Sequence, residues 1–412
     1  MNLLFDFITL RVKTGAGEYV RRVFYELMDR LLQSDQNVKV FALHDSKTPV
    51  AYEDMTSEKL GITFLDVSVK TIAEIVNENK IDRFFIGCSQ YIGEYPALEK
   101  IKCEVICVTH DLCYEEHYYN RTRPFFYLNM KDAEKPATLT WMERQKMRLF
   151  PKTHYDNFVK WYLTIGGIEG IGKELFRMKN IMKLYHANPR FHFIVVSDYT
   201  KVSAMYHLGI PEEHIQVLYS PERLFRESDK IENEELAETV RLGKKYYLMV
   251  SCHRNDKNPT KALHAFKVYC RNHPNYFIVT IGYKDRLFDN HIDLSFLSDN
   301  DLMNAYKHCY AMLYPSFFEG FGYPPLEAMH YEKPILCSNV SSMPGIYGVA
   351  PIYFSPMYES SIFSALNTLT DSNYIEYSQK SKEQYDRVKK RQERDLDSLL
   401  FLLLRTNKCE VH

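Results

Sequence analysis

The most informative stretch of the sequence runs from Tyr314 to Met329 and reads YPSFFEGFGYPPLEAM. We expect an apolar strand to end at Tyr314 and a loop containing Gly320 and Gly322 to follow it. The Pro324-Pro325 pair then suits the first turn of a helix, because proline has the φ angle of that position and needs no amide donor there. Glycine backbone just before a helix N-terminus is typical of a site that binds an anion.

Two carboxylates flank this predicted anion site. Glu319 lies in the loop, and we expect Glu327 to lie on the first turn of the helix. Carboxylates accept hydrogen bonds from sugar and ribose hydroxyls, whereas backbone amides can hold a diphosphate. The pattern therefore fits a sugar nucleotide. A helix-capping loop is the alternative, because the helix dipole favours a glutamate in the first turn in any case.

The chain around this stretch alternates short apolar runs with longer amphipathic ones, which predicts parallel α/β layers. The C-terminal half has expected strands at 246–251, 276–281, 311–314 and 334–337, and expected helices at 259–272, 301–309 and from Pro324. The N-terminal half has expected strands at 3–8, 38–43, 83–87, 105–109, 193–196 and 216–219, and expected helices at 17–32, 68–79, 173–186 and 200–208. Polar residues 222–244 are interpreted as a linker with room for a short helix. A charged helix is expected from Ser378 to the apolar end of the chain.

Length and composition limit the class of protein. A chain of 412 residues is too long for one ordinary core, so two domains are expected. The formal net charge of −1 gives no reason to expect a nucleic-acid partner. Nine cysteines without a CxxC pair indicate reduced thiols, not disulfides or a zinc site. There is no recognisable signal peptide and no apolar run of roughly 18 residues, so we expect a cytoplasmic protein. Its oligomeric state stays open.

No metal site is expected. Asp395-Leu-Asp397 is a DxD string, but it lies in the charged C-terminal helix, where this spacing directs the two acids apart. The sequence also lacks a GxSxG elbow and a P-loop.

Several segments together resemble family 4 of the retaining GT-B glycosyltransferases, also called glycosyl transferases group 1. They are Leu294 to Leu302, Pro315-Ser316, residues 319–322 and Glu327-Ala-Met, with continuations at 333–339 and 341–344. The similarity is dense from Tyr246 to Phe354 and loose before. It implies a GT-B fold: two Rossmann-like, doubly wound domains that face a central cleft, with a C-terminal helix returning to the N-domain. Domains at 1–225 for the acceptor and 226–385 for the nucleotide sugar follow, with the returning helix at 386–412.

The resemblance also implies roles for the two-glutamate loop. Glu319 would lie against the donor sugar, near its 3- and 4-hydroxyls, and Glu327 would bind the ribose. The backbone from Gly320 through Phe321 and Gly322 to Tyr323 would hold sugar and phosphate oxygens.

A second segment, Tyr246 to Pro259, resembles the strand and loop in which the family neutralises the leaving diphosphate. Lys257 matches the family's lysine, and Arg254 stands for an arginine that the family places at varying distances. Cations are chemically reasonable there, because negative charge grows on the leaving oxygen in the transition state. Ser251 replaces a customary glycine and is also expected to contact the donor. A solvated basic loop is the alternative.

The N-terminal half contributes two further resemblances. The loop around Gly15 and Gly17 lacks the third glycine of a dinucleotide-binding fingerprint, but it resembles the family loop that closes over the diphosphate. His110, in Val108-Thr-His-Asp-Leu112, would meet the donor sugar or the acceptor hydroxyl. Without the resemblance, a lone histidine after a strand is more often structural.

Two departures from the family concern Gly345, where relatives usually carry a glutamate, and an insertion at about 113–190. Residues 121–190 hold 14 Lys and Arg against 6 Asp and Glu, with interleaved aromatics. Such a segment suits an anionic membrane surface or a lipid-diphosphate acceptor. It equally suits a helix that packs on its own domain, and the sequence leaves these readings open.

The function implied by the resemblance is transfer of a hexose, with mannose favoured, from a nucleoside diphosphate sugar to a glycan or lipid-linked acceptor in surface-polysaccharide synthesis. No metal or other cofactor is expected. A catalytically idle GT-B partner subunit is one alternative, and a GT-B-type sugar-nucleotide epimerase or phosphorylase is another. Nucleotide binding without turnover would indicate the partner subunit. Epimerisation without an acceptor would indicate the epimerase, and phosphate-dependent glycan cleavage the phosphorylase.

Overall fold

The computed structural model describes residues 1–11, 14–48, 61–113, 115–116, 168–223 and 228–405. Most of the basic and aromatic insertion and Lys13 of the first glycine loop lie outside these residues. The chain divides into two compact units. Among the described residues, the first unit comprises those up to Arg223 and those from Lys390, and the second comprises 228–389.

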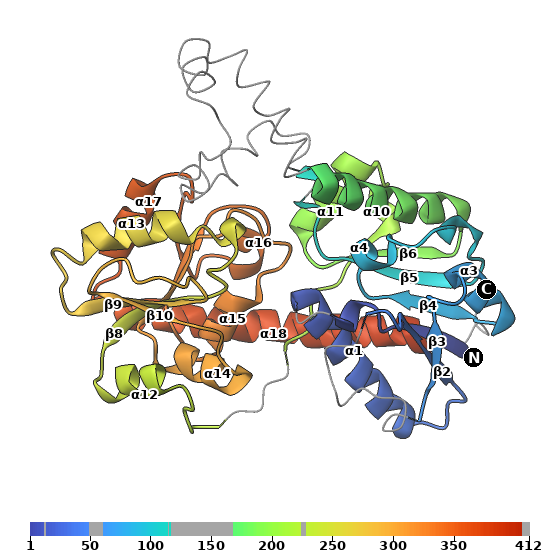
Figure 1. The fold of residues 1–412 in the computed structure, drawn as a ribbon, viewed down its shortest axis with the longest axis horizontal. Coiled ribbons are helices and arrows are strands. Elements are labelled where there is room, and N and C mark those ends of the chain that lie inside the picture. The colour runs from blue at the N-terminus through green and yellow to red at the C-terminus, as the bar shows by residue number, and fades with distance from the viewer. Residues whose placement is uncertain (12–13, 49–60, 114, 117–167, 224–227, 406–412) are drawn as a thin grey trace, which may run out of the picture. The chain divides into compact units, whose positions relative to one another are not determined.

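The first unit is built on a seven-stranded parallel sheet with the order β3-β2-β1-β4-β5-β6-β7 (Figure 1). Its strands are β1 (Asn2–Asp6), β2 (Lys39–His44), β3 (Thr63–Asp66), β4 (Arg83–Ile86), β5 (Glu104–Thr109), β6 (Phe191–Val195) and β7 (Ile215–Val217). Its helices are α1 (Gly15–Leu32), α3 (Ile72–Glu78), α4 (Ser89–Ile92), α10 (Ile168–Ala187) and α11 (Asp198–Leu208). Both faces are covered, as is usual for parallel sheets.

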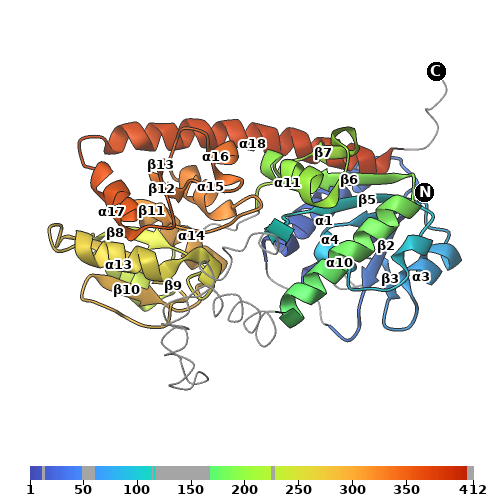
Figure 2. The same cartoon turned by 90° about the horizontal axis from the view of Figure 1, so that it is seen from above.

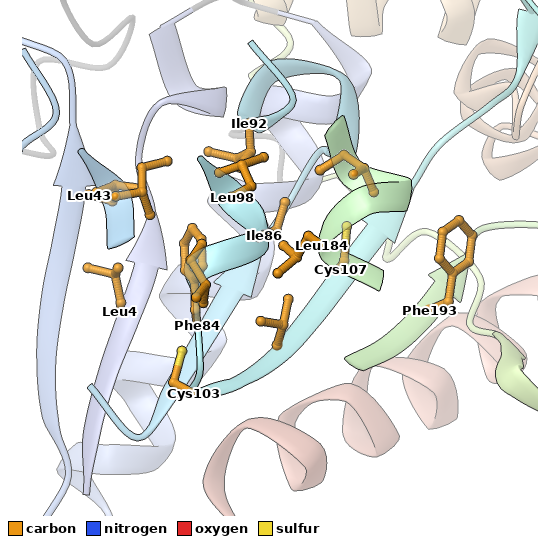
Figure 3. Packing of buried hydrophobic residues seen from close by; sticks show 14 of the residues in the cluster. Leu4, Leu43, Phe84, Ile86, Ile92, Leu98, Cys103, Cys107, Leu184 and Phe193 are labelled. Carbon is orange, nitrogen blue, oxygen red and sulfur yellow. The ribbon is translucent and has the colours of Figure 1, made fainter. Parts of the chain in front are cut away.

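Neighbouring residues on the central strands point to opposite faces of this sheet. Leu4 and Phe84 belong to the core cluster shown in Figure 3, together with Leu184 of α10. Phe5 and Phe85 lie on the other face, where the ring centroid of Phe5 is 5.2 Å from that of Phe24 in α1. The period of two along β1 and β4 therefore places α1 and α10 on opposite sides.

The second unit is built on a six-stranded parallel sheet with the order β10-β9-β8-β11-β12-β13. Its strands are β8 (Lys245–Met249), β9 (Tyr276–Ile281), β10 (His291–Leu294), β11 (Ala311–Tyr314), β12 (Ile335–Ser338) and β13 (Ile352–Phe354). Its helices are α12 (Glu234–Arg241), α13 (Pro259–Tyr269), α14 (Asp299–His308), α15 (Tyr323–His330), α16 (Met343–Tyr347) and α17 (Glu359–Thr368).

Helix α18 (Tyr374–Leu404) is continuous over 31 residues and contributes to both units (Figure 2). Its first part donates Gln384 Nε2 to Ile346 O at 2.6 Å in the second unit. Its last part accepts from the first unit, where the amide of Tyr219 donates to Asp395 Oδ2 at 2.9 Å. Asp395 is buried whereas Asp397 is 63% exposed, so the two acids of the DxD string do point apart.

These observations confirm the predicted fold class of two doubly wound parallel sheets with a long C-terminal helix. Three strands were not predicted, namely β3, β10 and β13. In β10 the polar Asp293 interrupts the apolar run. The expected strand at 3–8 ends at Asp6, where a 3₁₀ turn (Thr9–Arg11) follows. The helix expected from Ser68 begins at Ile72, because the side chain of Thr71 caps it.

The polar stretch after Glu222 contains the short helix α12 and is tied to the second unit. Asp301 of α14 accepts hydrogen bonds from the amides of Glu232 and Asn233 at 2.8 and 3.1 Å. Within the described ranges, no helix is both long and apolar enough to cross a membrane.

Candidate functional site

The loop after β11 is held in a conformation that only glycine adopts easily. Gly322 has a φ angle of +86° and forms the N-cap of α15. A Cβ atom built on Gly322 would lie 2.3 Å from the hydroxyl oxygen of Tyr347. The same hydroxyl is held close to the loop, because it donates to the carbonyl oxygen of Gly322 at 2.5 Å. The glycine is therefore required both by backbone geometry and by space.

The carboxylate of Glu319 is the centre of the site. Its Oε1 atom accepts hydrogen bonds from the ammonium of Lys257, the phenol of Tyr314 and the hydroxyl of Ser316, the last at 2.6 Å. Its backbone is also fixed. The Glu319 amide donates to Ser341 Oγ at 3.0 Å, and Ser342 Oγ donates to the Glu319 carbonyl at 2.9 Å. Hydrogen bonds within the protein thus hold both the backbone and the side chain of Glu319.

Lys257 reaches this carboxylate from the loop after β8. Ser251 takes a φ angle of +58° there, and its carbonyl accepts from the Arg254 amide at 3.1 Å. The turn that follows ends at Lys257, which is 8% exposed and also lies 3.5 Å from Asp256 Oδ2. The amide of Phe317 donates to the Asp256 carbonyl at 2.8 Å. This bond joins the two predicted donor-site loops.

Arg254 belongs to the same cluster, but it does not contact Glu319 directly. Its Nε and Nη2 atoms donate to the two oxygens of Asp256 at 3.0 and 2.7 Å, and its side chain is 55% exposed. Partial burial alone would lower the pKa of Arg254, but the charges of Asp256 and Glu319 outweigh it and raise that pKa. Two cations and two carboxylates therefore balance each other where the two loops meet.

Glu327 is buried in α15, with 7% of the residue exposed. The prediction that it occupies the first helical turn is wrong. The helix begins at Tyr323, so Glu327 is its fifth residue and lies in the second turn. The helix dipole acts mainly on the first turn, so the capping-loop alternative does not explain this residue. Burial chiefly raises the pKa of Tyr347, and the charges of both Glu319 and Glu327 add to that rise.

Of the remaining predicted residues of the second unit, Gly320 and Phe321 lie in the loop after β11, and Tyr323 is the first residue of α15. Gly320 and Phe321 follow Glu319, and the Phe321 carbonyl accepts from Ser342 Oγ at 3.5 Å. Gly345 lies in α16, and a Cβ atom built on it would meet nothing within 4 Å. A side chain at this position, such as the family's glutamate, therefore has space.

His110, Gly15 and Gly17 belong to the first unit. His110 follows β5, and its Nε2–H donates to the Gly87 carbonyl at 2.9 Å, which leaves Nδ1 as an acceptor. Burial lowers the pKa of His110 to about 4, so the ring is neutral at pH 7. Gly15 and Gly17 start α1, and the Gly17 amide donates to the hydroxyl of Thr14 at 3.3 Å. Tyr19 of α1 packs against the His110 ring at 4.9 Å between centroids.

Several residues of the cluster were missed by the sequence interpretation. Tyr314, Ser316 and Asp256 lie inside or beside the quoted motifs, but no spacing rule marks them as partners of Glu319 and Arg254. Ser342 and Tyr347 come from a segment about 25 residues further on, and only folding brings them to the loop.

The described part of the basic insertion packs on its own unit. In α10, Met178 is buried, and Met182 and Tyr185 pack against the core of the first unit. Arg177 forms an ion pair with Glu94, whereas Lys179 and Lys183 are exposed. Residues 176–187 therefore favour the interpretation of a packed helix with a solvated basic side. The aromatic residues at 125–162 lie outside the described residues. Among the residues that are described, no group of three His, Cys, Asp or Glu side chains could hold a metal ion.

Comparison with known sequences matches this chain to one family. The sequence profile of the family described as glycosyl transferases group 1 matches residues 230–349. O-antigen chain mannosyltransferase B of Escherichia coli is 39% identical over 84 residues, which are 20% of this chain and 22% of that protein. O-antigen chain mannosyltransferase RfbU of Salmonella typhimurium is 27% identical over 190 residues, 43% of this chain and 50% of that protein. The chain thus spans half or less of the length of these relatives.

Comparison with solved structures covers nearly the whole chain. A glycosyltransferase from Rickettsia africae superposes with a TM-score of 0.59 at 12% identity, over 98% of this chain and 99% of the other. Anabaena Alr3699/HepE in complex with UDP and glucose gives 0.60 at 13% identity, and WaaG, a glycosyltransferase involved in lipopolysaccharide biosynthesis, gives 0.54 at 14%. Both cover 97% of this chain and 99% of the other. At these sequence identities the similarity shows the fold alone, which is GT-B.

Proposed function

Because this chain belongs to the glycosyl transferases group 1 family and has the GT-B fold, we propose that it is a retaining glycosyltransferase. It moves a hexosyl group from a nucleoside diphosphate sugar to a hydroxyl of a glycan or lipid-linked acceptor. The observation that carries the proposal is the Glu319 carboxylate, which accepts from Lys257 in a loop that ends at the N-terminus of α15.

In this proposal Lys257 and Arg254 neutralise the departing diphosphate. Both side chains are paired with carboxylates, so a diphosphate that binds them exchanges one set of anionic partners for another. The cations then stabilise the charge that grows on the leaving oxygen. The open backbone from Gly320 to Tyr323, together with Ser251, holds the sugar and phosphate oxygens.

The two glutamates have separate roles. Glu319 orients the donor sugar and stabilises its oxocarbenium-like transition state, in which the sugar leaves and is attacked on the same face. Glu327, on the helix that follows, accepts from the ribose hydroxyls. Its position on the helix that directly follows the glycine loop supports this role.

His110 accepts a hydrogen bond from a sugar or acceptor hydroxyl through Nδ1, and Gly15 and Gly17 close over the diphosphate. The low pKa of His110 supports an acceptor role, because a neutral ring with Nε2 already donating has one lone pair left. The same observation argues against a cationic role for this histidine at neutral pH.

Mannose is the sugar that we propose, with an acceptor that belongs to a cell-surface polysaccharide. The support comes from the relatives, because both O-antigen chain enzymes named above are described as mannosyltransferases. We place the reaction in the cytoplasm, where the eight described cysteines, all free, would stay reduced.

A binding screen followed by a transfer assay tests the proposal. Thermal shifts with GDP, UDP, dTDP and ADP should single out one nucleotide, since a ligand at 100 times its Kd adds roughly 2.7 kcal/mol of stability. EDTA should leave the shift unchanged, because protein cations neutralise the diphosphate. GDP-mannose with an extracted lipid-linked acceptor should then give a mannosylated product. Binding without any transfer would instead indicate an idle partner subunit, and conversion of the donor without an acceptor would indicate an epimerase.

A further inference from the structure

Three hydrogen-bond donors converge on one oxygen of Glu319, and only one of them is charged. Tyr314, at the end of β11, is 2% exposed, and its phenol donates to Oε1. Burial, and secondarily the charge of Glu319, raise the pKa of Tyr314 well above its usual value. The phenol therefore keeps its proton and is a hydrogen-bond donor at neutral pH.

Ser316 is the second neutral donor. Its Oγ atom lies 2.6 Å from Glu319 Oε1, 3.2 Å from the Phe318 carbonyl and 3.3 Å from the Asp256 carbonyl. A hydroxyl has a single proton, and the charged acceptor at the shortest distance takes it. Ser316 is fully buried, so water does not compete for this bond.

Lys257, the charged donor, would also bind the diphosphate in the proposed reaction. It lies between Glu319 and Asp256, and a diphosphate carries more negative charge than either carboxylate. When the ammonium turns toward a diphosphate, Glu319 loses its only cationic donor among the described residues. A carboxylate on a flexible side chain would then be free to change rotamer.

We propose that Tyr314 and Ser316 are positioning residues that hold the Glu319 carboxylate in place while Lys257 engages the diphosphate. They anchor Oε1, and the other oxygen, Oε2, accepts from the donor sugar. This inference rests on the proposed function, because it assigns the sugar to Glu319 and the diphosphate to Lys257. It adds separate roles within the site: the neutral donors Tyr314 and Ser316 orient Glu319, whereas the cation neutralises the leaving diphosphate.

The test compares the variants Tyr314→Phe, Ser316→Ala and their combination with the wild type, using calorimetry with GDP and with GDP-mannose. If another nucleotide is selected in the screen, that nucleotide and its sugar replace them. We expect the Kd for the free nucleotide to stay within about twofold, since Lys257 is intact. In the double variant, the gain in affinity of GDP-mannose over GDP should fall about tenfold, and kcat should fall about tenfold as well. A hydrogen bond to a charged group contributes roughly this much.

Tyr246→Phe is the matched control. Tyr246 is fully buried on the neighbouring strand β8, and its hydroxyl donates to the Ala305 carbonyl at 2.7 Å, away from Glu319. Tyr246→Phe should lose stability as Tyr314→Phe does. It should not change kcat or the difference in affinity between GDP-mannose and GDP. If both tyrosine variants behave alike, Tyr314 has only a structural role and the inference is wrong.

A crystal structure of the double variant with pyrophosphate separates this inference from the proposed function. Glu319 is expected in a different rotamer there, whereas an unchanged carboxylate position would overturn the inference even if the wild type transfers mannose. Conversely, a displaced Glu319 in a protein without transfer activity would support the positioning role and contradict the proposed transferase function.

Discussion

Gly322 and Gly345 lie 23 residues apart in the same unit, yet a methyl group has opposite effects at the two positions. At Gly322 the backbone has φ +86° and the Tyr347 hydroxyl stands 2.3 Å from the position of a Cβ atom. Left-handed backbone costs an alanine about 1–2 kcal/mol, and the displaced tyrosine adds to this. We expect Gly322→Ala to lower both the free energy of unfolding and nucleotide binding, measured by urea titration and calorimetry.

Gly345→Ala is the control for that substitution. The new methyl group would meet nothing within 4 Å, and alanine is favoured over glycine in a helix by about 0.5–1 kcal/mol. It should leave binding unchanged and stability equal or slightly higher. Equal losses in the two variants would contradict the assigned geometry of the loop.

His110 makes stability depend on pH in a predictable direction. Its pKa is about 4 in the folded protein and about 6.5 in an unfolded chain, so the unfolded state binds more protons between these values. The contribution of His110 is therefore complete above pH 6.5 and is lost as the pH falls toward 4, by at most about 3 kcal/mol.

Unfolding of the wild type and of His110→Gln at pH 7 and pH 5 isolates this contribution from that of other groups. The wild type should lose more stability between the two pH values than the variant does. His291, whose pKa burial also lowers to about 4, remains in both proteins and cancels. Parallel losses would mean that His110 is not held neutral by its surroundings.

Among the elements, α12 shows how a polar segment joins a folded unit. Asp301 is 4% exposed and accepts from two backbone amides of the preceding segment, so it anchors α12 to α14. Asp301→Ala would leave both amides without this acceptor and should cost about 1–3 kcal/mol. Hydrogen exchange of the α12 amides should accelerate in the variant.

Asp299→Ala provides the comparison within the same helix. Asp299 also lies in the first turn of α14, but it is exposed. Both substitutions remove a negative charge from the positive end of the helix, which is worth about 0.3–1 kcal/mol at the surface. A larger loss in Asp301→Ala, together with faster exchange of the α12 amides, would support the anchoring of α12, and no excess would show that the segment is held by other contacts.

At the scale of the whole molecule, the end of α18 completes the first unit. Arg83, 1% exposed, donates from Nη1 to the carbonyls of Leu403 and Arg405 at 2.8 and 3.0 Å. Its Nε donates to Glu104 at 2.8 Å, and Arg405 donates to the same carboxylate at 2.7 Å. The last carbonyls of a helix lack partners within the helix, so a buried arginine that satisfies them fixes where α18 ends.

Leu400 and Phe401 test whether the end of α18 is part of the core of the first unit, because these adjacent residues differ in burial. Leu400 is fully buried and Phe401 is 67% exposed. Leu400→Ala should cost about 2–5 kcal/mol, as for other buried leucines. Phe401→Ala should change stability by less than about 0.5 kcal/mol. Thermal unfolding followed by circular dichroism distinguishes the two, and similar midpoints would mean that this end of α18 is not part of the core.

The sequence was sufficient for features that depend on neighbours along the chain. Alternating apolar and amphipathic runs predicted both doubly wound sheets, and the strand at Ala311–Tyr314 and the glycine loop after it were placed correctly. Local signals missed β3, β10 and β13. They also placed the start of α15 one residue late, which put Glu327 in the first turn. The roles of Glu319, Lys257, Arg254 and His110 stay predictions.

The partners within the site came only from the tertiary structure. No local pattern indicates that the phenol of Tyr314 and the hydroxyl of Ser316 share one oxygen of Glu319 with Lys257, or that Tyr347 encloses Gly322. The reason is physical. Periodicity records which face of a strand or helix is buried, whereas a hydrogen bond depends on where two loops from separate strands end in space, and that position is set by the packing of the whole sheet.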